Sequence, residues 1–154
     1  MKSQVNKVFI LDDETEYLHY HVEDLNTNGV EIDLYRDPVE AVLALSKNDT
    51  NYDVYIVDLI MSVDLNDSDH SLLDSINTPS HAYVENGLAM GRWVLDHIPS
   101  NARVLVLTNR KLSRISWQKD YQKKFEVIEF RQKQDTPAYF FYDELVNLVC
   151  IKNQ

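Results

Sequence analysis

The sequence has one cysteine, Cys150, and no apolar stretch long enough to cross a membrane. A lone cysteine cannot form an intramolecular disulfide or assemble a cysteine-based metal site, which fits a reducing compartment. The first apolar run covers only residues 8–11 before acidic residues follow, and this is too short for the core of a signal peptide. We therefore expect a cytoplasmic protein that does not act at a membrane.

Basic residues are also scarce. The 154 residues include 15 Lys and Arg against 25 Asp and Glu, which gives a formal net charge of -10. Such a charge disfavours attraction to a nucleic-acid backbone or an anionic membrane. The hydrophobic content of 44% is enough for one good core. We expect a single domain over residues 1–154 and no direct contact with nucleic acid.

Short apolar runs recur along the chain and alternate with stretches of helical period. Most of the runs are continuous, which is typical of strands that are covered on both faces. Five repeats of strand and helix predict an α/β domain with a parallel sheet wrapped by helices. The last helix is expected to hold Pro137 in its first turn. The five runs are Val8 to Leu11, Ile32 to Tyr35, Val54 to Leu59, Val104 to Leu107 and Val127 to Phe130.

One polar segment, residues 63–85, interrupts this alternation. It contains five acidic residues and no Lys or Arg, and it is far longer than the usual connection between a strand and a helix. We interpret it as an acidic insertion in the loop after the third strand, on the surface of the same domain. Our hypothesis is that it controls access of a partner or forms a partner surface.

Polar residues follow the apolar runs at the predicted carboxyl ends of the strands, where open parallel sheets bind their ligands. Asp12 and Asp13 follow the first run, Asp58 lies near the end of the third, Thr108 ends the fourth, and Lys133 follows the fifth. Converging carboxylates repel one another unless a cation lies among them. Mg²⁺ prefers such oxygen ligands together with water and phosphate oxygens.

These residues resemble the receiver domains of response regulators, the phosphate-accepting modules of two-component signalling. The resemblance covers the chain apart from the insertion, and it implies a flavodoxin-like fold with strand order 2-1-3-4-5. It rests on five motifs in the family's order: Leu11-Asp12-Asp13-Glu14, Val57-Asp58-Leu59-Ile60-Met61, Gly87 at the start of the third helix, Leu107-Thr108, and Phe130-Arg131-Gln132-Lys133.

The resemblance implies a phosphoacceptor and not an enzyme. Asp58 would receive a phosphoryl group from a histidine kinase or a histidine phosphotransfer protein. Mg²⁺, or Mn²⁺ in its place, would be bound by Asp12, Asp13, Asp58 and the backbone carbonyl of Ile60.

The resemblance also implies a switch. Thr108 and Lys133 would bind the phosphoryl group, and Thr108 and Phe130 would rearrange together upon phosphorylation. The change would reach a face made by the fourth helix, the fifth strand and the fifth helix, where a downstream target protein would bind. Such a switch is a population shift between two packings.

Three positions depart from the family pattern. Ser62 and Gln134 stand where family members usually carry proline, and Asn109 stands where a small residue is typical. Asn109 and Ser62 are therefore candidate modulators of the site. The change at Gln134 leaves open whether Lys133 or Arg131 enters the site, and we favour Lys133 because the aromatic partner then falls on Phe130.

The sequence also suggests two other classes of function. A pseudo-receiver of the same fold would act as a protein-interaction module without phosphorylation. The departures at Ser62, Asn109 and Gln134 favour it slightly, whereas the complete set of acids opposes it. A flavin carrier or a haloacid-dehalogenase-type phosphatase would also use a related fold. The first would need a phosphate-binding loop after the first strand, and the second an Asp-x-Asp pair, whereas this chain has Asp12-Asp13-Glu14.

Overall fold

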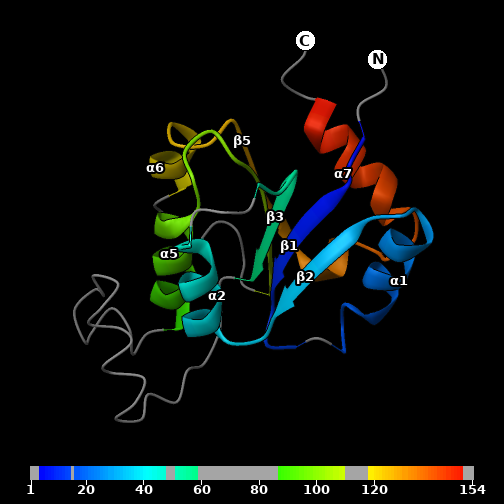
Figure 1. The fold of residues 1–154 in the computed structure, drawn as a ribbon, viewed down its shortest axis with the longest axis horizontal. Helices are drawn as coiled ribbons and strands as arrows, with labels where there is room; N and C mark the ends of the chain where they lie inside the picture. Colours follow the sequence, from blue (N-terminus) through cyan, green and yellow to red (C-terminus); the bar gives the residue numbers. More distant parts are fainter. Residues whose placement is uncertain (1–3, 15, 48–50, 59–86, 110–117, 151–154) are drawn as a thin grey trace.

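The structure, a computed structural model, describes residues 4–14, 16–47, 51–58, 87–109 and 118–150. These residues contain five parallel strands in one sheet of order β2-β1-β3-β4-β5, which confirms the predicted fold class (Figure 1). The strands are β1 (Lys7–Leu11), β2 (Glu31–Tyr35), β3 (Val54–Asp58), β4 (Arg103–Thr108) and β5 (Val127–Gln132).

The central strands form because their side chains are apolar on both faces of the sheet. In β1, Val8 and Ile10 pack into one core cluster while Phe9 and Leu11 pack into the other. All four side chains are fully buried. The edge strand β2 instead carries Glu31 and Asp33, as expected for a strand with one open side.

Helices cover both faces of the sheet, as Figure 1 shows. One face packs against α1 (His19–Thr27) and α7 (Phe141–Cys150). The other packs against α2 (Pro38–Leu45), α5 (Gly87–His97) and α6 (Gln118–Gln122). A short 3-10 helix, η2 (Lys133–Asp135), follows β5 and leads toward α7. Because all five strands are parallel, their carboxyl ends lie at the same edge of the sheet, between the two layers of helices.

The start of α7 differs from the sequence prediction. Pro137 was expected in the first turn of the last helix, but α7 begins only at Phe141. Phe140 has a φ of 60°, a left-handed conformation that cannot continue a right-handed helix. The Phe141 amide donates to the Ala138 carbonyl at 3.2 Å, so the residues before the helix form a separate turn.

Several predictions fall outside the described residues. They concern the insertion at residues 63–85, the backbone carbonyl of Ile60, the side chain of Ser62, and part of the expected fourth helix at residues 110–117. Within the described ranges, the longest apolar helix is too short to cross a membrane.

Candidate functional site

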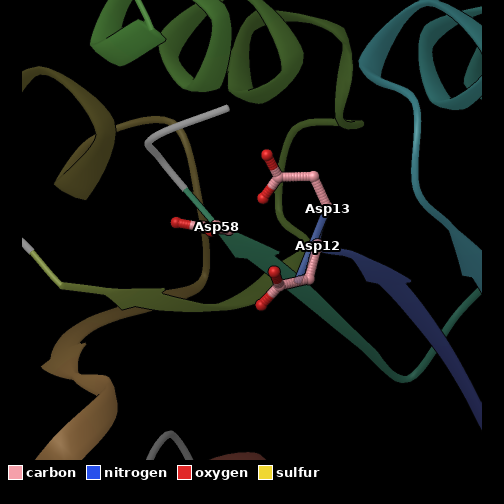
Figure 2. Close-up of side chains that lie close together, drawn as sticks. All are labelled: Asp12, Asp13 and Asp58. Atoms are coloured by element: carbon pink, nitrogen blue, oxygen red, sulfur yellow. The ribbon is translucent and has the colours of Figure 1, made fainter. Parts of the chain in front are cut away.

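Three carboxylates lie together at the ends of β1 and β3 (Figure 2). Asp12 follows β1 directly and its amide donates to the Tyr35 carbonyl at 3.0 Å, so the hydrogen bonding of β1 with β2 continues to the edge of the site. Asp58 is the last residue of β3. Asp12 and Asp58 are buried, whereas Asp13 is exposed. The site therefore has two enclosed acids and one that faces solvent.

Lys133 places its ammonium among these acids. Its Nζ lies 3.0 Å from an oxygen of Asp12 and 3.0 Å from an oxygen of Asp58, and 3.4 Å from Glu14. The lysine is only 3% exposed although its side chain is charged. A buried ammonium at this position is stabilised by the carboxylates around it, because an unpaired buried charge is very costly.

Arg131 does not enter this group. Its guanidinium donates to Glu129 and to Glu144, with its Nη1 at 2.8 Å from the Glu144 carboxylate. Glu144 belongs to α7, so Arg131 ties the fifth strand to the last helix. The structure thus brings Lys133 to the acids and leaves Arg131 in a separate ion-pair cluster.

The charges in the site are not balanced. Burial would lower the pKa of Lys133, but the charges of Asp58 and Asp12 outweigh burial and raise it, so the lysine stays charged at neutral pH. Burial raises the pKa of Asp12, although the Glu14 amide and Lys133 oppose that shift. One ammonium therefore serves several acids, and the group keeps an excess of negative charge.

This excess suits a divalent cation. Asp12, Asp13 and Asp58 each offer one carboxylate oxygen, and these oxygens lie within 4.8 Å of one another. An all-oxygen set with room for water at the exposed Asp13 is the kind of site that Mg²⁺ prefers, and Mn²⁺ accepts similar ligands. The residues present therefore fit a hard divalent ion, by the chemistry of the donors and by the excess charge.

Thr108 and Phe130 lie beside this group on the neighbouring strands. Thr108 is the last residue of β4, is fully buried, and lies one position beyond the residue that pairs with Asp58. Phe130 is opposite Val106 in β5 and packs, half-buried, against the core on the α5 side of the sheet. Asn109 is exposed at the strand end. Thr108 is thus at the same edge as the acids, while Phe130 is set back toward the core.

Two further residues contact the site, although we assigned them no role in it from the sequence. Glu14 completes the set of acids around Lys133, and its amide donates to Asp12 at 2.8 Å. The hydroxyl of Tyr17 donates to the backbone carbonyl of Lys133. Tyr17 belongs to an apolar pattern of helical period, and such a pattern gives no sign that its polar end contacts a loop more than a hundred residues away.

Many of the solved structures that match this fold over most of the chain are receiver domains of response regulators. Three examples come from Francisella, Clostridium thermocellum and Bacillus halodurans. The Francisella receiver domain is 16% identical with a TM-score of 0.52, and the match covers 94% of this chain and 96% of that one. The Clostridium protein is 18% identical with a TM-score of 0.58, covering 97% and 98%. The Bacillus protein is 19% identical with a TM-score of 0.54, covering 94% and 97%.

The chain matches no family model and no curated protein. The structural likeness therefore establishes a class of fold: this chain has the doubly wound, flavodoxin-like fold of receiver domains, with the same strand order.

Proposed function

We propose that this protein is a phosphoacceptor of a two-component pathway, in which Asp58 receives a phosphoryl group from a histidine kinase or a histidine phosphotransfer protein. The observation that carries the proposal is the position of Asp58. It ends a buried strand, faces the ammonium of Lys133 at 3.0 Å, and shares one edge of the sheet with Asp12 and Asp13.

Asp58 acts as the nucleophile in this proposal. One of its carboxylate oxygens attacks the phosphorus of a phosphohistidine, a new O–P bond forms, and the P–N bond breaks with its electron pair remaining on the imidazole. The product is an acyl phosphate on Asp58. Lys133 neutralises charge on the phosphoryl oxygens, and its ammonium is already within hydrogen-bonding distance of the reacting carboxylate.

Asp12, Asp13 and Asp58 hold a divalent cation in this proposal, together with the backbone carbonyl of Ile60. When bound, the cation would neutralise the excess negative charge of the acids and allow a phosphoryl group to approach them. Asp13 is the ligand open to solvent, and it lines a surface hollow together with Glu14, Glu16, Tyr17 and Arg36.

Thr108 and Phe130 would pass the change to a partner. Thr108 donates its hydroxyl to the new phosphoryl group, and Phe130 then shifts against the core on the α5 side, where it already packs. The altered face is made by the fourth helix, which includes α6, by β5 and by α7, and it binds a downstream protein. In this proposal Asn109 and Ser62 alter the access of a phosphodonor to Asp58. The acidic insertion at residues 63–85 belongs to the same domain. The protein acts in the cytoplasm.

The proposal predicts one covalent phosphoryl group per chain. The full chain is incubated with acetyl phosphate and MgCl₂, and its intact mass is measured over time. We expect a single phosphoryl addition that does not form when EDTA is present from the start and is absent in Asp58→Asn. Asp120→Asn is a matched control, because Asp120 is an exposed acid on α6 outside the cluster. Equal phosphorylation of the wild type and Asp58→Asn would refute the assignment.

One observation favours the pseudo-receiver as a second candidate. Lys133 already joins Asp12 and Asp58 in a buried ion pair, which could hold the site in one state without any phosphoryl group. A wild-type protein that gains no mass from acetyl phosphate in saturating Mg²⁺, yet still binds a partner protein, would support this second function instead.

A further inference from the structure

The turn that carries Lys133 forms hydrogen bonds with Tyr17, which lies in the segment that leads into α1. The 3-10 helix η2 has only three residues, and such short turns have little stability of their own. The carbonyl of Lys133 accepts one hydrogen bond from the Thr136 amide at 3.2 Å and another from the Tyr17 hydroxyl. The Tyr17 hydroxyl also lies 3.2 Å from the Thr136 carbonyl.

His21 contacts the same turn one helical turn further along. Its Nε2 lies 2.8 Å from the Thr136 carbonyl, and both residues are buried. A carbonyl can only accept, so Nε2 carries the hydrogen of this bond. Nδ1 is buried and has no hydrogen-bond partner within the described part of the chain. The Nε2 bond is therefore the polar contact that fixes the orientation of this ring.

The ring of Tyr17 contacts the other end of the lysine. The Nζ of Lys133 lies 5.3 Å from the centre of the Tyr17 ring, at a distance typical of a cation–π contact. Burial raises the pKa of Tyr17, so the phenol keeps its proton and remains a donor at neutral pH. Tyr17 thus bonds the backbone of Lys133 through its hydroxyl and contacts the ammonium of Lys133 through its ring.

We propose that Tyr17 and His21 are positioning residues, which hold the Lys133 turn against α1 and so fix the ammonium of Lys133 opposite Asp58. Neither side chain touches the phosphoryl group, and both act through the lysine. The segment from Asp12 to His21 then supplies the acids at one end and the contacts for the lysine turn at the other. This role rests on the proposed function, because it concerns the rate at which Asp58 is phosphorylated.

The test compares variants that remove the polar contacts of one side chain at a time. Tyr17→Phe keeps the ring and loses the hydroxyl, and His21→Leu loses the donor to Thr136. His21→Gln is the conservative variant, because its side-chain amide can still donate to that carbonyl. Tyr52→Phe is the matched control: it removes a tyrosine hydroxyl that donates to Asp33 at 2.5 Å, and Tyr52 lies before β3 at the opposite end of the sheet.

Two measurements are made on each variant: the rate of phosphorylation by acetyl phosphate, and the hydrogen exchange of the Thr136 amide. We expect Tyr17→Phe and His21→Leu to lower the rate roughly fivefold, the factor that follows from losing one ordinary hydrogen bond. Both should also speed exchange at Thr136. His21→Gln should recover most of the rate, and Tyr52→Phe should match the wild type.

The outcomes separate this role from the proposed function. If the wild type is phosphorylated and Tyr17→Phe and His21→Leu match it in rate, the positioning role is wrong. An equal loss in Tyr52→Phe, or no recovery in His21→Gln, would also overturn it, because the effect would then be general weakening of the fold. If the wild type gains no phosphoryl group, the proposed function fails, and unchanged exchange at Thr136 in both variants would separately show that the pair does not hold the turn.

Discussion

Lys133→Met is expected to lower the free energy of unfolding by about 3 to 5 kcal/mol in metal-free buffer, the usual cost of breaking a buried ion pair. Methionine fills a similar volume, so the loss would come from charge and not from packing. The ammonium is 3.0 Å from both Asp12 and Asp58, and all three residues are buried. Removing it leaves two buried carboxylates without their cation.

The loss of unfolding free energy in Lys133→Met should depend on pH. Lys133 normally lowers the pKa of Asp12, against the effect of burial. Without the lysine, the folded state holds a proton on Asp12 more tightly than the unfolded state does. Stability then rises as the pH falls. In the wild type, the raised pKa of Lys133 means that its contribution is fully present at neutral pH and is lost only in strongly alkaline solution.

Denaturant unfolding at several pH values in EDTA measures both effects. Lys7→Met is the control, because Lys7 forms two looser contacts, 3.8 Å and 4.0 Å, to Glu31 and Asp33 at the other end of the sheet. Exposed pairs of this kind contribute about 0 to 1 kcal/mol. A Lys133→Met protein no less stable than Lys7→Met would show that the central ion pair is not the one described.

Asp13→Asn is expected to weaken Mg²⁺ binding about tenfold or more. At about 4 Å, two unit charges interact by about 4 kcal/mol at the dielectric typical of a protein surface, and solvent at the exposed Asp13 reduces this value. Asp13 is a sharper choice than Asp12, because Asp12 also bonds Lys133 and the Glu14 amide and so supports the fold. The substitution should leave metal-free stability unchanged or slightly higher, since it relieves repulsion between acids.

Calorimetric titration with MgCl₂ gives the affinity of each variant directly. Glu31→Gln is the matched control, because it makes the same change in net charge at the start of β2, away from the site. Its Mg²⁺ affinity should equal that of the wild type. Equal affinities for all three proteins would mean that Asp13 is not a ligand.

The central strands could be predicted because their residues are apolar on both faces and such runs have few alternatives. All five predicted runs overlap observed strands, and no end differs by more than two residues within the described ranges. The start of α7 could not be predicted, since the left-handed Phe140 is set by the turn that precedes it and not by any helix-breaking residue type.

The candidate site was predictable in part. The acids could be placed because the carboxyl ends of parallel strands share one edge of a sheet. The choice between Lys133 and Arg131 required the direction of each side chain in β5 and the turn after it. Arg131 lies on the side of α7, where Glu144 binds it, and the chain then turns through η2 to bring Lys133 to the acids.

Nothing in the sequence around Tyr17 and His21 indicated their contacts with the Lys133 turn. The two residues are four apart and share one face of α1 and the turn before it, so they fit the pattern of core residues. Only the packing of α1 beside α7 shows that their polar atoms meet the Lys133 turn. In our proposal this tertiary contact holds the Lys133 turn. Gln134 follows the lysine in this chain, at the position where receiver domains usually carry proline.

The measurement that tests the central claim most directly is the location of the phosphoryl group. After reaction with acetyl phosphate and Mg²⁺, the acyl phosphate is reduced with borohydride, which converts the modified aspartate to homoserine, and the peptides are sequenced by mass spectrometry. Homoserine at position 58 alone is the predicted result. Homoserine at position 12 or 13, or none anywhere in a protein that binds Mg²⁺, would contradict the account.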